Sequence, residues 1–470
     1  MALKFVFVAA FLASTVRCQG QRQVDGRWLQ PDGPYLTGVV DLMTSSSDQD
    51  KGILMRIFYP VVGNQTAPVY TTDWAPEPRD QYFEGVARAT GATPEQIPLV
   101  VQQLQESWGA TTLPYLWTGA VAPGQFPLIL FSHMLAGERW QHQMIAGAIA
   151  ANGYIVAAPE HRGGTASYSY NVWLNGTNQA IYLSQDANPD DGDLNGWAKI
   201  INNRYSELMR AERVLRQLSK YGVYPTPESA SQNPMVQLAV FDWAQFRDRV
   251  SPTSASIVGH SMGGTTAIAT LVNPNIRSAI VYDGGAYLRL PSTLPSSIRN
   301  RGSALPSMLF IEADSNDTYS CNNHRVHSLF TDWVRSPCTT TGVYVLRASE
   351  HTTFADTTYM SVSSQESLDR LHAQQRVINQ LSVYGINSQS ASSFSDVILS
   401  NADQLVDACR NPRCPKPPST QLPQLDASVN NETSANQQAV RTVRTNRWYP
   451  SLIKSVPGLD RLMERMKKRK

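Results

Sequence analysis

A glycine-flanked serine between an apolar run and a helix-compatible run constrains this chain more than any other feature. Ser261 stands between Gly259 and Gly263, with Gly264 behind them, in the segment SIVGHSMGGTTAIATL. A sharp strand-to-helix turn leaves no room for side chains, so it needs glycine on both sides. Such a turn pushes its serine out of the sheet edge, and it aims the N–H of Met262 at charge developing on an attacked carbonyl. The pattern therefore predicts a nucleophilic serine.

Continuous apolar runs bounded by turn signals alternate with helical patterns along much of the chain. Two β segments at 35–43 and 52–60, parted by the polar SSSDQDK, predict a hairpin-like entry to a sheet. Further buried strands are expected at FPLILFSH, GYIVAAPE, SASIVGHS, SAIVYDGG, SMLFIEAD and GVYVLRAS. Strands alternating with helices favour a mostly parallel sheet. Together with the serine turn, they predict an α/β class chain with the α/β-hydrolase fold, its mostly parallel central sheet flanked by helices.

The length and composition suit one large domain with tails. The chain has 470 residues, of which 42% are hydrophobic and 17% charged. Its net charge of +2 gives no overall field that would indicate nucleic-acid binding. We predict an α/β-hydrolase catalytic domain over 21–409, with residues 21–32 loose. A Pro/Ser/Asn-rich linker over 410–440 and a basic, amphipathic C-terminal tail over 441–470 are expected to follow.

The first residues are typical of a secretory signal. Lys4 precedes the apolar run FVFVAAFLA, which is too short to span a bilayer and ends in small and polar residues. We predict a signal peptide over 1–20 and a secreted, extracellular protein, with a buried first strand as the alternative. No other stretch approaches 18 apolar residues, so no transmembrane segment is expected.

Secretion through an oxidising compartment would allow cysteines to form disulfides and asparagines in sequons to be glycosylated. Cys18 leaves with the signal, which leaves an even number of cysteines. The local disulfides Cys321–Cys338 and Cys409–Cys414 are expected, although the two other pairings stay open. The sequence also contains four N-x-T sequons, which are candidate glycosylation sites. The sequon asparagines are Asn64, Asn175, Asn316 and Asn431.

A serine nucleophile needs an oriented base, and in this fold the order along the chain is serine, acid, histidine. His351 directly follows the strand GVYVLRA and stands in a loop, where the base belongs. His324 and His327 lie in a polar insertion, and His372 lies inside a predicted helix. We therefore predict that His351 is the base.

The acid has three candidates. Asp283 ends the strand after the serine strand, Asp314 ends the next one, and Asp317 follows closely. Fold logic alone favours Asp314 or Asp317, because the acid more often follows the second of these strands. The second oxyanion donor is expected in the loop 133–137, after FPLILFSH.

Seven ordered motifs resemble the secreted, calcium-independent platelet-activating-factor acetylhydrolases, the lipoprotein-associated phospholipase A2 group. The resemblance runs from about Gly33 to about Tyr359. The motifs are GPYLTGVVDLM, GILMRIFYP, FPLILFSHMLAGER, GYIVAAPEHRGGTAS, FDWAQFRDRVSPTSASIVGHSMGGTTAI, AIVYDGGAY and SEHTTFADTTY.

The resemblance implies Ser261 as nucleophile, Asp283 as orienting acid and His351 as base, with the backbone amides of Leu135 and Met262 as the oxyanion hole. It thus moves the expected acid one strand earlier than fold logic alone. It also implies hydrolysis of the sn-2 acetyl or short, oxidised acyl ester of glycerophospholipids at a lipoprotein or membrane surface. No metal or other cofactor is expected. A broad carboxylesterase on soluble short-chain esters and a non-catalytic lipid-binding protein are the alternatives.

The chain departs from the family at several points. Met134 and Ala136 stand where the family usually has glycine, and we expect the Met134 side chain to narrow the acyl pocket. The amphipathic segment 97–108 either dips into a lipid surface or packs on the domain as a lid helix. The tail 441–470 carries ten Lys and Arg against two acidic residues, and is either a contact for anionic surfaces or a solvated end.

Overall fold

A computed structural model of the chain describes residues 26–47, 51–63, 71–189, 193–224, 235–236, 238–285, 297–298, 300, 306–314, 341–387 and 391–407. The predicted signal peptide, linker and basic tail, and all cysteines, lie outside these residues. The other predicted features outside them are Asn64, Asn316, Asn431, Asp317, His324 and His327.

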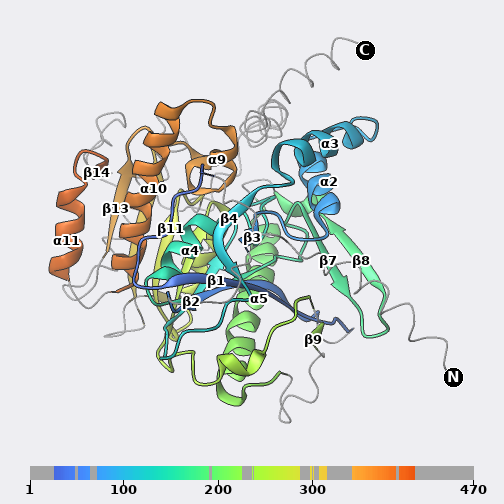
Figure 1. Ribbon diagram of the computed structural model, residues 1–470, viewed down its shortest axis with the longest axis horizontal. Helices are drawn as coiled ribbons and strands as arrows, with labels where there is room; N and C mark the ends of the chain where they lie inside the picture. Colours follow the sequence, from blue (N-terminus) through green and yellow to red (C-terminus); the bar gives the residue numbers. More distant parts are fainter. Residues whose placement is uncertain are drawn as a thin grey trace.

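A twelve-stranded sheet organises the described part of the chain (Figure 1). Its order is β14-β13-β12-β11-β10-β5-β6-β2-β1-β4-β3, with β9 paired to β1. The strands are β1 (Leu36–Thr44), β2 (Leu54–Val61), β3 (Thr71–Asp73), β4 (Thr112–Trp117), β5 (Leu128–Ser132), β6 (Ile155–Pro159), β9 (Met235–Val236), β10 (Ala255–His260), β11 (Ile276–Tyr282), β12 (Ser307–Ala313), β13 (Thr341–Leu346) and β14 (Leu405–Asp407). A separate hairpin joins β7 (Tyr168–Val172) to β8 (Asn178–Tyr182).

The strand order confirms the α/β-hydrolase fold. Strands β5, β6, β10, β11, β12 and β13 run parallel, whereas β2 is antiparallel to both β1 and β6. The chain goes from β5 to β6 on one side and then returns to β10 on the other. This reversal puts the carboxyl ends of β5 and β10 side by side, at the edge where open α/β sheets bind their ligands.

Helices cover both faces of the sheet. On one face, α4 and α10 pack in one apolar cluster, and on the other, α5 and α6 pack in a second. Alternate residues of each strand serve the two clusters, as Phe131 and Leu130 of β5 do. The helices and 3-10 turns are α2 (Arg79–Ala89), α3 (Ile97–Trp108), α4 (Gln143–Ala151), η1 (Gln185–Ala187), α5 (Leu194–Tyr221), η3 (Trp243–Phe246), α6 (Met262–Thr270), η5 (His351–Phe354), α9 (Thr357–Ser361), α10 (Gln365–Ile386) and α11 (Ala391–Ser400).

The structure settles which way α3 faces. Ile97, Val100, Leu104 and Trp108 are buried in the same cluster as α4. This apolar face therefore packs on the domain and is not available to a lipid surface. None of the helices in the described part of the chain combines the length and the apolar character that a bilayer crossing requires.

Two expectations about local structure were wrong. Trp28 lies in the segment expected to be loose, but it is buried and its ring centroid lies 5.1 Å from that of Tyr359. Strands β3, β4, β7, β8, β9 and β14 were not predicted. They are short or partly polar, so their pairing depends on neighbouring strands more than on their own apolar pattern.

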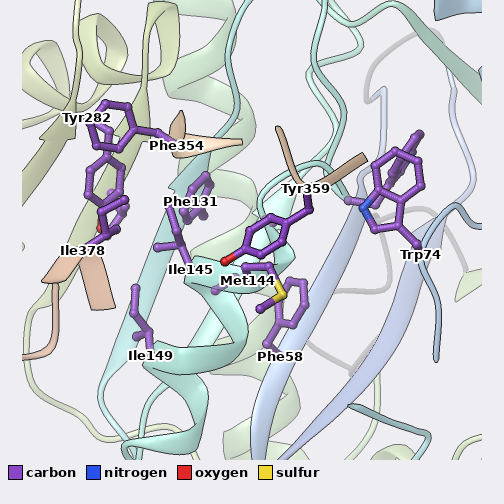
Figure 2. Packing of buried hydrophobic residues seen from close by; sticks show 14 of the residues in the cluster. Phe58, Trp74, Phe131, Met144, Ile145, Ile149, Tyr282, Phe354, Tyr359 and Ile378 are labelled. Carbon is purple, nitrogen blue, oxygen red and sulfur yellow. The ribbon is translucent and has the colours of Figure 1, made fainter. Parts of the chain in front are cut away.

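The segment after His351 is anchored in the core. Figure 2 shows Phe354 beside Tyr282 of β11, and Tyr359 beside Met144 of α4. The rings of Phe354 and Tyr282 stack with their centroids 5.5 Å apart. Buried aromatic anchors of this kind hold a loop in one conformation, so the position of His351 is tied to the sheet.

Candidate active site

Ser261 occupies a strained turn between β10 and α6. Its φ of 58° and ψ of −120° lie outside the regions that side chains other than glycine favour. The Ser261 N–H donates to the carbonyl oxygen of Tyr282 at 2.9 Å, and only 2% of the residue is exposed. A Cβ on Gly259 would lie 2.1 Å from the carbonyl oxygen of Gly263. The turn is thus so tight that both flanking positions require glycine, as the sequence pattern predicts.

Asp283 and His351 are hydrogen-bonded to each other. Asp283 Oδ2 and His351 Nδ1 lie 2.5 Å apart, and the other carboxylate oxygen accepts the Ala313 N–H of β12 at 3.2 Å. His260 of β10 pairs with Tyr282 of β11 at the end of both strands. The next residues, Ser261 and Asp283, therefore follow neighbouring strands at the same level. The bond at Nδ1 leaves Nε2 as the ring nitrogen facing away from the carboxylate. Serine, carboxylate and imidazole therefore all lie at the same edge of the sheet.

Two further imidazoles lie behind His351, and the sequence reasoning missed both. The His260 ring centroid is 4.7 Å from that of His351, and His260 Nδ1 lies 2.9 Å from Nε2 of His142. Burial, reinforced by the nearby His351, lowers the pKa of His260 well below its ordinary value and that of His142 to about 3. Both rings are therefore neutral near pH 7, and neither competes with His351 for a proton.

The loop that carries His351 is held from two sides by carboxylates. Asp314 Oδ2 accepts the Ala348 N–H at 2.9 Å, so this acid candidate supports the turn before the histidine. Asp356 accepts the N–H groups of Gln143 and Met144, the first residues of α4, at 2.8 and 3.1 Å. Burial raises the pKa of Asp356 to about 7, opposed by these N–H groups. The only sequence signal for Asp356 was its place in the HTTFAD segment.

The loop after β5 lies beside the serine turn. A Cβ on Gly263 would lie 1.9 Å from the Ser132 carbonyl oxygen, so α6 abuts the end of β5. Leu135 packs against Met262, which brings the two expected oxyanion donors onto neighbouring segments. Ala136 has a φ of 57°, where a side chain is strained and glycine is not. The departure from the family glycine therefore leaves local strain in this loop.

Other predicted sites are distributed as follows. Asn175 is exposed at the tip of the β7–β8 hairpin, and His372 lies in α10, where its Nε2 contacts the carbonyl oxygen of Arg27 at 2.9 Å. Among the described residues, no three His, Cys, Asp or Glu side chains are grouped so as to hold a metal ion.

Comparisons with known proteins add the family. Residues 23–379 match the family described as platelet-activating factor acetylhydrolase, isoform II. The chain belongs to this family. Curated relatives named platelet-activating factor acetylhydrolase are 29% identical in Cavia porcellus, 28% in Canis lupus familiaris and 26% in Bos taurus. The matches cover 51%, 70% and 70% of this chain.

The same matches span 51% of the Cavia porcellus protein and 68% of each of the other two, so about half of the first relative is aligned. Among solved structures, a ferulic acid esterase from Streptomyces cinnamoneus is similar at 16% identity and a TM-score of 0.45, with 82% of this chain and 94% of that chain covered. The strand order, rather than this likeness, establishes the fold. Family membership supports a lipid ester hydrolase.

Proposed function

We propose that this chain is a secreted serine esterase that hydrolyses the sn-2 acetyl or short, oxidised acyl ester of glycerophospholipids to lysophospholipid and free acid. The observation that carries the proposal is the 2.5 Å contact between His351 Nδ1 and Asp283 Oδ2, beside the strained turn at Ser261. An imidazole oriented by a carboxylate next to a serine at the sheet edge is the arrangement that activates a hydroxyl for acyl transfer. Family membership supplies the substrate class.

In the proposed first half-reaction, Ser261 Oγ attacks the ester carbonyl carbon while His351 Nε2 takes the hydroxyl proton. Asp283 keeps Nδ1 protonated and stabilises the imidazolium that forms. The carbonyl electron pair moves to the oxygen, which accepts hydrogen bonds from the backbone amides of Leu135 and Met262. The carbon–oxygen bond to glycerol then breaks, and His351 returns its proton to the leaving oxygen.

The second half-reaction repeats these steps with water. His351 takes a proton from the water that attacks the acyl-serine carbonyl, and the same two amides hold the oxyanion. Collapse releases the free acid and returns the proton to Ser261 Oγ. The scheme uses only side chains and backbone amides of this chain.

An apolar patch beside the oxyanion loop supports a short acyl group. Leu135 packs against the buried side chains of Trp197, Ile200 and Met262, and Met134 is half-buried at the start of the same loop. We propose that these side chains form the acyl side of the pocket and that Met134 limits the chain length that fits.

The proposed location is extracellular, at a lipid surface. The exposed sequon at Asn175 supports passage through a glycosylating compartment, and Thr177 Oγ1 donates to Asn175 Oδ1 at 2.7 Å at the hairpin tip. Expression in a mammalian cell line tests this: the protein should enter the medium and lose mass on treatment with an N-glycosidase. Asn175→Gln should remove one glycan, and unglycosylated protein retained in the cells would contradict secretion.

Labelling with a fluorophosphonate tests the nucleophile. The native protein should be labelled and Ser261→Ala should not, with the denaturation midpoints of the two proteins as a control for folding. Hydrolysis of a short-chain phosphatidylcholine is then compared with that of a p-nitrophenyl ester. Hydrolysis of the soluble ester alone would indicate a broad carboxylesterase, and no labelling of the native protein would indicate a binding protein.

The acid is tested by two matched substitutions. Asp283→Asn should lower kcat by about 10⁴, because the imidazole then loses the orientation of its proton. Asp314→Asn replaces the charged acceptor of the Ala348 N–H with a neutral amide and should lower kcat less than about tenfold, since Asp314 reaches His351 only through the loop. Loss of turnover in Asp314→Asn alone would show that Asp283 is not the acid.

A further inference from the structure

Arg204 is a buried cation in an unusual environment. It lies on α5 with 1% of its surface exposed. Its guanidinium donates to the carbonyl oxygens of His133 and Met134, at 2.6 and 3.3 Å, and to Thr165 Oγ1 at 3.0 Å. Within the part of the chain that the structure describes, all its hydrogen-bond acceptors are neutral. Burial of a guanidinium without a bonded carboxylate is unfavourable, so another interaction must keep it there.

The contact with Met134 determines the direction of one peptide group. The Met134 carbonyl oxygen lies 2.8 Å from His133 Nδ1 and also accepts the Gly137 N–H at 3.1 Å, in addition to the Arg204 donor. His133 Nε2 accepts the His161 N–H at 3.1 Å, so Nδ1 carries the ring proton and donates it. In a trans peptide the C=O and N–H groups point in opposite directions. Three donors on the Met134 oxygen, of which Arg204 is the charged one, therefore aim the Leu135 N–H away from Arg204.

The Leu135 N–H and the Met262 N–H, the two expected oxyanion donors, are both open. Among the described residues, neither of them donates to a protein acceptor. Leu135 packs against Met262, and the close approach of Gly263 to Ser132 holds α6 against the end of β5. Two adjacent N–H groups without a protein acceptor are arranged to bind an anionic oxygen.

We propose that Arg204 is a positioning residue of the oxyanion hole: it fixes the Met134–Leu135 peptide so that the Leu135 N–H meets the developing oxyanion. Its positive charge lies on the far side of that one peptide group, polarises it and favours negative charge at the N–H end. The inference rests on the proposed attack by Ser261.

A second set of contacts supports the same positioning. His161 Nδ1 lies 2.7 Å from Glu207 Oε2, and His161 Nε2 lies 2.8 Å from Ser132 Oγ. Arg204 Nη1 reaches the same Oγ at 3.5 Å. Ser132 and His161 are fully buried, so this serine–histidine–glutamate array is no second nucleophile. It ties Arg204 and Glu207, one turn apart on α5, to the strand end from which the oxyanion loop begins.

The test compares Arg204→Met and Arg204→Lys with the native protein. Two quantities are measured for each protein: the steady-state kinetics on a p-nitrophenyl ester, and the inhibition constant of a trifluoromethyl ketone. On this ketone, Ser261 Oγ adds to the carbonyl carbon, its proton goes to His351, and the carbonyl oxygen becomes the oxyanion. Arg204→Met should lower kcat about 100-fold with KM little changed, and should weaken the ketone by a similar factor. Arg204→Lys keeps the positive charge but loses the planar set of guanidinium N–H donors, and should lower kcat about tenfold.

Arg216 provides the matched control. It lies on the same helix and also donates to two backbone carbonyls, those of Ser251 and Thr253 at 3.1 and 3.0 Å, at the opposite end of β10 from Ser261. Arg216→Met should lower the denaturation midpoint and leave kcat and ketone affinity unchanged. If Arg204→Met does not fold, Arg204→Lys decides. A folded Arg204 variant with native kcat and ketone affinity would overturn the proposal, whereas an inactive native protein would refute the proposed function itself.

Discussion

Gly263→Ala is expected to disable the site through a displacement that follows from the structure. The added Cβ would lie 1.9 Å from the Ser132 carbonyl oxygen and 2.8 Å from that of His133. Real Cβ atoms essentially never approach closer than 3.0 Å, so the helix and strand must separate by at least 3.0 − 1.9 = 1.1 Å. Both atoms belong to the backbone, so no side chain can rotate to relieve the contact. The Met262 N–H then moves relative to the Leu135 N–H.

A misplacement of about 1 Å at a reacting centre costs about 100-fold in rate. We therefore expect kcat/KM on a p-nitrophenyl ester to fall at least about 100-fold, with a loss of about 1–3 kcal/mol in unfolding free energy from overpacking. Gly385→Ala in α10 is the control, because its Cβ would meet side-chain atoms and no backbone, the nearest being the ends of Leu309 at 2.9 Å and Ile280 at 3.4 Å. A folded Gly263→Ala protein with kcat/KM within threefold of native would refute the reasoning.

Three further outcomes are expected. Ser261→Gly should have an unfolding free energy about 1 kcal/mol higher than that of Ser261→Ala, because glycine tolerates the φ of 58° that alanine does not. Urea unfolding measures the difference, and equal midpoints would show that the turn is unstrained. Burial alone would raise the pKa of Asp41, but the charges of Arg139 and Arg56 outweigh it and lower the pKa to about 2. The pKa of Asp41 is near 3.9 in the unfolded chain, so its ionised carboxylate contributes about 2 kcal/mol to the unfolding free energy above about pH 4. This contribution is lost as the pH falls towards 2. The unfolding free energies of Asp41→Asn and the native protein, measured by urea unfolding, should therefore approach each other as the pH falls towards 2. A difference that does not change with pH would contradict the lowered pKa of Asp41. Met134→Gly should raise the rate on longer sn-2 chains relative to acetyl, measured by competing substrates, and an unchanged ratio would show that Met134 does not limit the pocket.

The sequence by itself determined the fold class and the serine turn, because both are written in local patterns. Strands buried on both faces need continuous apolar runs, and a turn as tight as that at Ser261 excludes side chains at Gly259 and Gly263. The position of His351 after a strand was equally local. The hairpin-like start appeared as β1 and β2, and the confirmed family rests on motifs that follow one another along the chain.

Only the tertiary structure shows the contacts by which the charged groups of the site meet. Fold logic favoured Asp314 or Asp317 as the acid, and the family resemblance implied Asp283. In the structure, the pairing of β10 with β11 and the aromatic anchor at Phe354 bring the His351 ring to Asp283. The partners lie 68 residues apart in the chain, and Arg204 lies 71 residues from His133. Side chains so distant in sequence leave no periodic signal, because their contact depends on the packing of α5 and the loop after β5 on the same sheet.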